Sequence, residues 1–147
     1  MYYPDTESEI LKELYKVAEK RKKEPVSRIE DVVLKLLFLR KKKIENVVFL
    51  LLDNANKVIK KIIIKGTVDQ AVVYPREIVK ECLLNDASAI IMAHNHPGGK
   101  KTFSINDITI TNRIRECLKL FEISLLDHVL ICNSGHNSLR NTVRWLN

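Results

Sequence analysis

The sequence predicts a mixed α/β fold in which one mixed sheet is flanked by helices. Runs rich in β-branched and aliphatic residues alternate along the chain with stretches whose apolar residues recur at the spacing of a helix face. At 147 residues and 46% hydrophobic composition, the chain is long enough to bury one core and short for two full domains. We therefore expect one domain with a modest N-terminal extension.

Two capping boxes predict helices in the first part of the chain. Thr6 is followed by Glu9, and Ser27 is followed by Glu30, a pattern in which hydroxyl and carboxylate satisfy free backbone donors at a helix start. Residues 9–20 could alternatively form an edge strand. After the second box the apolar residues recur at helical spacing and should pack on the core: Ile29, Val32, Val33, Leu36 and Leu37.

A β-hairpin is expected from two aliphatic runs, residues 47–52 and 58–64, which are separated by turn-forming residues at 53–56. Both runs are almost continuously apolar, which is typical of strands that are buried on both faces. The sheet should therefore lie between layers of helices.

Short strands and helices alternate in the rest of the chain. Val72 and Val73 predict a short strand, and Pro75 is compatible with the first turn of a helix that runs to Asn85. The remaining expected elements are a strand at 87–93, a turn at 94–99, a helix that begins at Ser104, a strand at 123–132, and a turn at 133–135 followed by a short tail.

The chain is basic, with a formal net charge of +7 and a pI near 9.4. Clustered Lys and Arg side chains would favour a nucleic-acid partner, because binding releases counterions. Residues 1–43 hold 12 basic and 8 acidic side chains, and residues 44–147 hold 13 and 10, so the charge is dispersed. Weak, non-specific contact with nucleic acid is the most that this distribution predicts.

The compartment is predicted from the absence of export signals and from the cysteines. No apolar run approaches the roughly 20 residues of a membrane span, and the N-terminus lacks the basic-then-apolar pattern of a secretion signal. Cys82, Cys117 and Cys132 form neither a CxxC pair nor an obvious disulfide framework. We expect a cytoplasmic protein with reduced thiols and no membrane partner.

Three side chains are candidate metal ligands. His94 and His96 are two residues apart at the end of a predicted strand, so they project to the same side. Asp107 lies one turn into the next helix and can converge on the same point. Two nitrogens and one oxygen suit Zn²⁺ and leave a fourth position for water. Ser104 and Asp107 could instead serve only as an N-cap and an acid favoured by the helix dipole.

The motif around these residues resembles that of a known metalloprotease family. The string HNHPGG at 94–99, followed by Ser104 and Asp107, resembles the JAMM (MPN+) motif, in which HxH is followed by seven residues and SxxD. The closer similarity is to the RadC branch of that family, whose motif reads HNHPSG. YPRE at 74–77 and LLDHVLI at 125–131 are also similar to that branch.

The resemblance implies a domain organisation and a fold. It predicts a RadC-like JAMM/MPN domain of the cytidine-deaminase-like three-layer type at residues 26–147, with residues 1–25 as an N-terminal extension. The loop of the motif departs from the RadC pattern and is more cationic, since its usual Ser, Asp and Pro residues are replaced by Gly98, Lys100, Lys101 and Phe103. Contacts with substrate should therefore differ more than the metal ligands do.

The resemblance also implies roles for individual residues. His94, His96 and Asp107 would hold one Zn²⁺ per chain, and Ser104 would hydrogen-bond near the water and the developing oxyanion. Glu45, at the start of a strand, matches the position of the glutamate that accepts the proton of the water. The implied reaction is hydrolysis of an amide bond in a peptide or isopeptide, with a peptide or protein as substrate.

Several alternatives stay open at this point. Glu77 is a rival carboxylate for proton transfer, although the first turn of a helix also favours an acid. Asp127 could orient a ligand histidine or make a structural hydrogen bond inside the sheet. A DNA-associated RadC-type accessory protein, a metal-dependent nuclease and a non-catalytic interaction module are the alternative functions. A two-metal nuclease would need more carboxylates than the motif supplies.

Overall fold

The computed structural model of the protein describes residues 6–66 and 73–142, and its centre is a mixed sheet of five strands. The strands lie in the order β2-β1-β3-β4-β5. β1 is antiparallel to both β2 and β3, whereas β3 and β4 are parallel. The strands are β1 (Asn46–Leu52), β2 (Val58–Lys65), β3 (Ala89–Asn95), β4 (Ser124–Cys132) and β5 (Gly135–Ser138).

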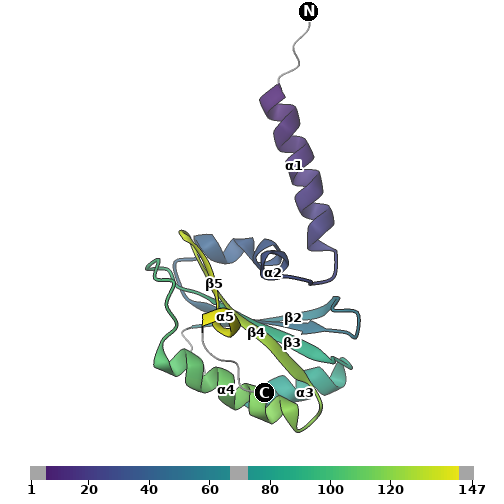
Figure 1. The fold of residues 1–147 in the computed structure, drawn as a ribbon, viewed down its shortest axis with the longest axis vertical. Coiled ribbons are helices and arrows are strands. Elements are labelled where there is room, and N and C mark those ends of the chain that lie inside the picture. The colour runs from purple at the N-terminus through teal and green to yellow at the C-terminus, as the bar shows by residue number, and fades with distance from the viewer. Residues whose placement is uncertain (1–5, 67–72, 143–147) are drawn as a thin grey trace, which may run out of the picture.

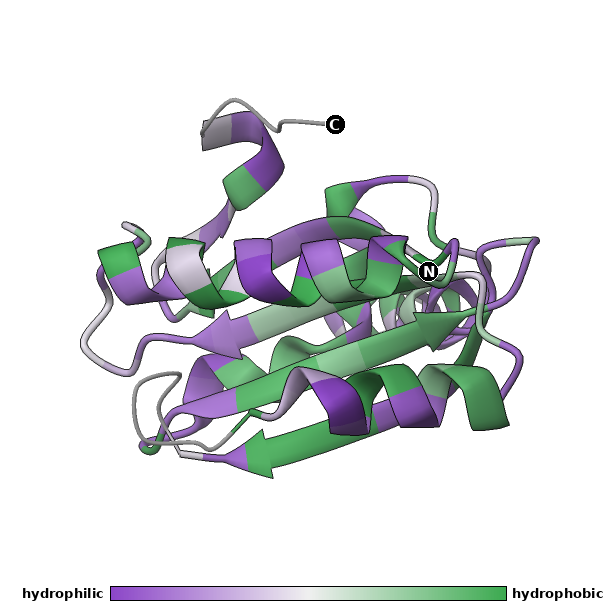
Figure 2. Ribbon diagram, turned by 90° about the horizontal axis from the view of Figure 1, so that it is seen from below, coloured by the Kyte–Doolittle hydropathy of each residue, from purple (hydrophilic) through white to green (hydrophobic). Residues whose placement is uncertain are grey.

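Helices cover the two faces of this sheet and give the predicted three layers (Figure 1). On one face, α2 (Ile29–Lys35) and the 3-10 helix η1 (Leu37–Lys41) pack on alternate residues of β1 and β3. On the other face, α3 (Pro75–Leu84) and α4 (Ile105–Lys119) pack on the remaining residues of these strands. The central strands are correspondingly apolar along most of their length (Figure 2). The predicted mixed α/β class is confirmed.

The predicted β-hairpin is present, but the predicted burial holds for only one of its two strands. β1 and β2 pair antiparallel, and every residue of β1 is buried, as expected for a central strand. β2 is an edge strand with mostly exposed or half-buried residues, and Ile59 and Ile63 are 40% and 45% exposed. The prediction that both arms are buried on both faces is therefore wrong for β2, because the helices pack on the central strands and leave the faces of this edge strand partly uncovered.

The start of α2 is capped differently from the prediction. The carboxylate of Asp31, and not that of Glu30, accepts hydrogen bonds from the backbone N–H and the hydroxyl of Ser27, both at 2.9 Å, and from the backbone N–H of Arg28 at 3.2 Å. The helix starts one residue later than the motif suggested. Free backbone N–H groups at a helix start need acceptors, and here the side chain of the third residue of the helix, Asp31, supplies them.

The helix predicted after Thr6 is confirmed, since residues 9–20 belong to α1 (Thr6–Lys22) and not to the alternative edge strand. Other elements differ from the prediction. Val73 lies outside any strand, and Val72 lies outside the described residues. The predicted short tail forms β5 and a short helix, α5 (Leu139–Thr142). The strand expected at 87–93 is shifted, since β3 runs to Asn95 and includes His94.

Candidate metal centre

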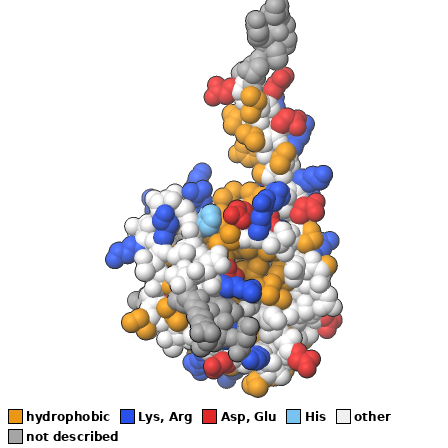
Figure 3. Space-filling view, in the orientation of Figure 1, with side chains coloured by type: hydrophobic (Ala, Val, Ile, Leu, Met, Phe, Trp, Pro, Cys, Tyr) orange, Lys and Arg blue, Asp and Glu red, His pale blue; other side chains and the backbone are white. Residues whose placement is uncertain are grey.

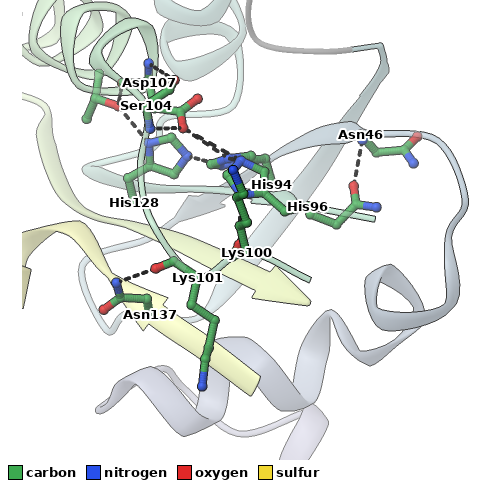
Figure 4. A network of polar contacts seen from close by, with 11 residues as sticks. Asn46, His94, His96, Lys100, Lys101, Ser104, Asp107, His128 and Asn137 are labelled. Carbon is green, nitrogen blue, oxygen red and sulfur yellow. Dashed lines mark hydrogen bonds and ion pairs between the residues drawn. The ribbon is translucent and has the colours of Figure 1, made fainter. Parts of the chain in front are cut away.

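The two histidines of the motif lie at the end of β3, where the sheet meets α4. His94 is the next-to-last residue of β3, is paired with Val47 of β1, and has a fully buried side chain. His96 follows the strand and is 17% exposed. Because strand residues two apart face the same side, both imidazoles point toward the start of α4 (Figure 4).

Asp107 is held on the other side of the centre by the cap of α4. Ser104 is the N-cap residue, and its Oγ accepts a hydrogen bond from the backbone N–H of Asp107 at 3.0 Å. The Asp107 carboxylate in turn accepts from the backbone N–H of Ser104 at 2.8 Å. This reciprocal pair fixes one carboxylate oxygen on the helix and leaves the side chain aimed at the histidines.

The Asp107 carboxyl is ionised in this environment. Burial by itself would raise its pKa, but the hydrogen bond and the charge of His94, with the backbone N–H of Ser104, outweigh that effect. The pKa of Asp107 is therefore lowered well below its usual value. A negative charge stands beside two imidazoles, which favours a cation at this point.

The distances between the three side chains fit a small divalent cation. His94 Nε2 and His96 Nε2 are 2.9 Å apart, and Asp107 Oδ2 lies 3.5 Å from the former and 3.7 Å from the latter. Ligands about 2.0–2.2 Å from a tetrahedral zinc ion are about 3.3–3.6 Å from one another. The two nitrogen–oxygen distances are close to this range, whereas the two nitrogens are about 0.4 Å closer than its lower end and would have to move apart slightly around an ion. The three residues form a group, among those that the structure describes, that could hold a metal ion.

Hydrogen bonds fix which nitrogen of His96 carries its proton. The Nδ1 of His96 lies 2.9 Å from the backbone carbonyl oxygen of Lys100. A carbonyl can only accept, so Nδ1 is the protonated nitrogen and Nε2 keeps its lone pair. The lone pair faces the centre, as a metal ligand requires.

A longer chain of hydrogen bonds does the same for His94. The Thr111 hydroxyl donates to the backbone carbonyl of Asp107 at 2.5 Å, so its oxygen accepts the Nδ1–H of His128 at 2.6 Å. The free Nε2 of His128 then accepts the Nδ1–H of His94 at 2.6 Å. In its neutral form, the form that binds a metal, His94 therefore has its lone pair on Nε2, which again faces the centre.

His128 is suited to this role because it is neutral. Burial, followed by the charge of His94, lowers its pKa well below the usual value, in spite of the opposing Asp107 carboxylate. The Phe103 ring lies 5.2 Å from the His128 ring and 6.0 Å from that of His94, and it shields both from solvent. The supporting network is thus dry and has one arrangement of protons that keeps both ligand nitrogens free.

Sequence reasoning missed His128 and Thr111 as supports of the centre, and it considered Asp127 for that role. The Asp127 carboxylate instead accepts from the Ser138 hydroxyl at 2.5 Å and the Arg140 backbone N–H at 3.1 Å, which fastens β5 and α5 to β4. The structural alternative for Asp127 is therefore the correct one. The position of Thr111, one helical turn after Asp107, is the feature of the sequence that could have indicated a support for the centre.

A bulge in β4 explains why His128 reaches the centre. Ile90 of β3 pairs with Leu125, whereas Ile91 pairs with Asp127, so β4 holds one extra residue at this point. The extra residue reverses the alternation of side chains. His128, and not Asp127, consequently faces α4 beside His94.

The predicted catalytic residues lie near the centre to different degrees. Ser104 is an exposed residue at its rim, and its bond to Asp107 leaves the hydroxyl proton unused. Glu45 is half-buried just before β1, at the strand end that pairs with β3 near His94. The Asn95 side-chain oxygen, which accepts from the backbone N–H of Asn46 at 2.7 Å, ties these two strand ends together.

The carboxylates of Glu45 and Glu77 differ in their surroundings. Glu45 is not one of the three residues of the metal-binding group, and a proton acceptor need not be one. Its catalytic role stays a prediction. Glu77 lies in the first turn of α3, is 56% exposed and is 3.8 Å from the Arg76 side chain. Its surroundings are those of an ordinary acid at a helix start.

Other properties of the described residues bear on the remaining predictions. Cys82, Cys117 and Cys132 are free thiols, and His136 is exposed as expected. Across residues 6–66 and 73–142, none of the helices combines the length and the apolar character that crossing a bilayer requires.

Comparison with known proteins extends the match beyond the motif. A UPF0758 protein of Clostridium perfringens is 44% identical over 117 residues, which are 78% of this chain and 52% of that protein. A UPF0758 protein of Vibrio cholerae is 47% identical over 94 residues, 63% of this chain and 42% of its own length. One from Bordetella bronchiseptica is 42% identical over 99 residues, 67% of this chain and 44% of its own length.

The chain thus spans about half the length of these relatives. The profile of a protein family described as the RadC-like JAB domain matches residues 26–144, a segment that includes the sheet, α4 and all three residues of the candidate metal centre. The chain belongs to the family of RadC-like JAB domains.

Proposed function

We propose that the protein is a zinc-dependent hydrolase that cleaves an amide bond in a peptide or isopeptide. The observation that carries this proposal is the convergence of His94 Nε2, His96 Nε2 and the ionised Asp107 carboxylate within one group of ligand atoms. The donor set suits zinc and leaves a coordination position for water. Membership of the RadC-like JAB family supports metal-dependent hydrolysis as the reaction class.

A zinc ion held by His94, His96 and Asp107 would supply Lewis acidity toward a carbonyl and toward water. The other steps fall to side chains of the chain. Glu45 accepts the proton of the attacking water and returns it to the leaving amine, which otherwise departs poorly. Ser104 donates its hydroxyl proton to the carbonyl oxygen as negative charge develops there.

The composition of the centre favours a hydrolase over a nuclease. Within the described part of the chain, the group that could hold a metal contains a single carboxylate, Asp107. Two-metal nucleases bridge their ions with several carboxylates. Nucleic acid, if it binds, should do so weakly and with strong salt dependence, since the basic side chains are dispersed. We also propose that the protein acts in the cytoplasm, where its three free thiols stay reduced.

The proposal is tested by metal analysis together with cleavage of defined substrates. Protein purified without chelator should contain about one zinc per chain, and it should cleave members of a library of peptides and Lys-linked isopeptides. Chelation should abolish cleavage and zinc should restore it. Zinc-loaded protein that cleaves none of these bonds but degrades DNA would contradict the proposal.

Glu45→Gln separates the role of Glu45 from that of the metal ligands. The amide keeps the shape of the side chain but cannot accept the water proton, so we expect kcat to fall about 100-fold or more at unchanged zinc content. Glu77→Gln is the matched control and should retain full activity. Full activity of Glu45→Gln, with loss of activity in Glu77→Gln, would transfer the role to Glu77.

A further inference from the structure

The N-terminal helix α1 carries an apolar stripe that its own domain does not cover. α1 projects away from the sheet (Figure 1), and apolar side chains lie along it (Figure 3). Ile10, Leu14 and Val17 follow the four-and-three spacing of a coiled-coil seam and are 58%, 59% and 59% exposed. Leu11 and Tyr15 flank the seam and are 52% and 72% exposed.

The contacts of α1 with its own domain lie at its C-terminal end. Arg21 donates to the buried Asp31 carboxylate at 3.3 Å, and the Lys35 ammonium donates to the backbone carbonyls of Lys22 and Glu24. These bonds fasten the base of the helix to α2. A 17-residue helix that is otherwise solvated is marginal in water, because helices in proteins gain most of their stability from packing an amphipathic face.

The charges of α1 specify what fits the seam. Residues 7–13 hold three Glu and one Lys, whereas residues 16–22 hold three Lys, one Arg and one Glu. This order also favours the isolated helix through its dipole, so the charges alone would not indicate a partner. Together with the apolar seam, however, the charges do indicate a partner, because an antiparallel copy of α1 places each acidic half against a basic half. A parallel copy would oppose like charges.

We propose that two copies of this chain associate through antiparallel pairing of their α1 helices. In one antiparallel register, Leu14 of each copy packs against Val17 of the other, and Glu13 lies opposite Lys20. The interface is small, so we expect a dissociation constant on the order of 10–100 µM. The pairing is independent of the proposed hydrolase activity and does not involve the metal centre.

Sedimentation equilibrium of the full 147-residue chain tests the pairing, over concentrations from about 5 to 500 µM that bracket the expected constant. The wild type should shift from monomer to dimer within this range. Leu14→Lys, which puts a charge into the seam of both copies, should stay monomeric, with unchanged zinc binding and with the helix content of the wild type at concentrations where that is monomeric. Leu120→Lys is the matched control, since Leu120 is 83% exposed at the end of α4, and it should still dimerise.

A charge exchange tests the antiparallel orientation. Glu13→Lys and Lys20→Glu should each weaken the dimer about 3- to 10-fold, because each opposes like charges twice in a symmetric pair. The double variant Glu13→Lys/Lys20→Glu should restore wild-type affinity. A wild type that stays monomeric over the whole range, a Leu14→Lys variant that still dimerises, or a double variant that remains weak would overturn the proposal.

Discussion

Thr111→Val is the substitution that most directly probes the hydrogen-bond chain behind His94. Valine has nearly the shape of threonine but cannot accept the Nδ1–H of His128, which the Thr111 hydroxyl accepts at 2.6 Å. When a metal is bound, His94 must keep its proton on Nδ1, so His128 must also keep its proton on Nδ1. That proton then faces valine inside a fully buried site.

The expected size of the effect follows from this burial. A buried donor without a partner costs about 1–3 kcal/mol, and each 1.4 kcal/mol is about tenfold in affinity. The cost falls mainly on the metal-bound state, because without metal the protons of His94 and His128 can move to their other nitrogens. We therefore expect zinc affinity to fall about 10- to 100-fold, as is typical when a support of a metal ligand is lost.

Competition with a chromophoric chelator at fixed pH measures this affinity without any substrate. Thr109→Val is the matched control, because the Thr109 hydroxyl donates to the carbonyl of Ile105 at 2.9 Å in the same way but lies on the exposed side of α4. Thr111→Ser should recover most of the affinity, since it restores the hydroxyl. Zinc binding by Thr111→Val within twofold of wild type would refute the proton assignment.

Two further predictions concern α2 and the loop after the histidines. Asp31→Asn should destabilise the protein by about 1–3 kcal/mol at pH 7, measured by urea unfolding. Burial opposes ionisation of Asp31, but the donors of Ser27, Arg28 and Arg21 lower its pKa, so its contribution is present above the unfolded-state value of about 3.9. The difference from wild type should therefore shrink as pH falls below that value, and a gap that stays constant to pH 2 would contradict the assignment. Replacing the exposed Lys100 and Lys101 by Ser should alter turnover or substrate preference at unchanged zinc content, since only their backbone carbonyls are engaged, by His96 and Asn137. Identical kinetics on an established substrate would show that these two side chains are merely solvated.

Patterns confined to neighbouring residues predicted much of the fold. The aliphatic runs and the polar residues between them gave the β1–β2 hairpin, and Pro75 marked the start of α3. Ser104 was placed correctly at the start of α4, because capping depends on residues within one turn. Where two residues competed for one local task, as Glu30 and Asp31 do at α2, the sequence pattern pointed to Glu30 and was wrong.

The metal-binding group was also predictable, because its members lie close together in the sequence. His94 and His96 share a strand end, and Asp107 lies in the first turn of the next helix, so short-range geometry can bring them together, and the resemblance to the JAMM motif singled them out. Glu45 is far away in sequence, and only the pairing of β1 with β3 carries it to the same end of the sheet.

The sequence by itself thus determined the class of fold, the three candidate ligands and the cap that aims Asp107. Only the tertiary structure decided which strand is an edge, and therefore that β2 is half exposed while β1 is enclosed. It also decided that His128 supports His94, because a one-residue bulge in β4 reverses which side chains face α4. Both depend on how strands pair across the sheet, and pairing is set by contacts between residues far apart in the chain.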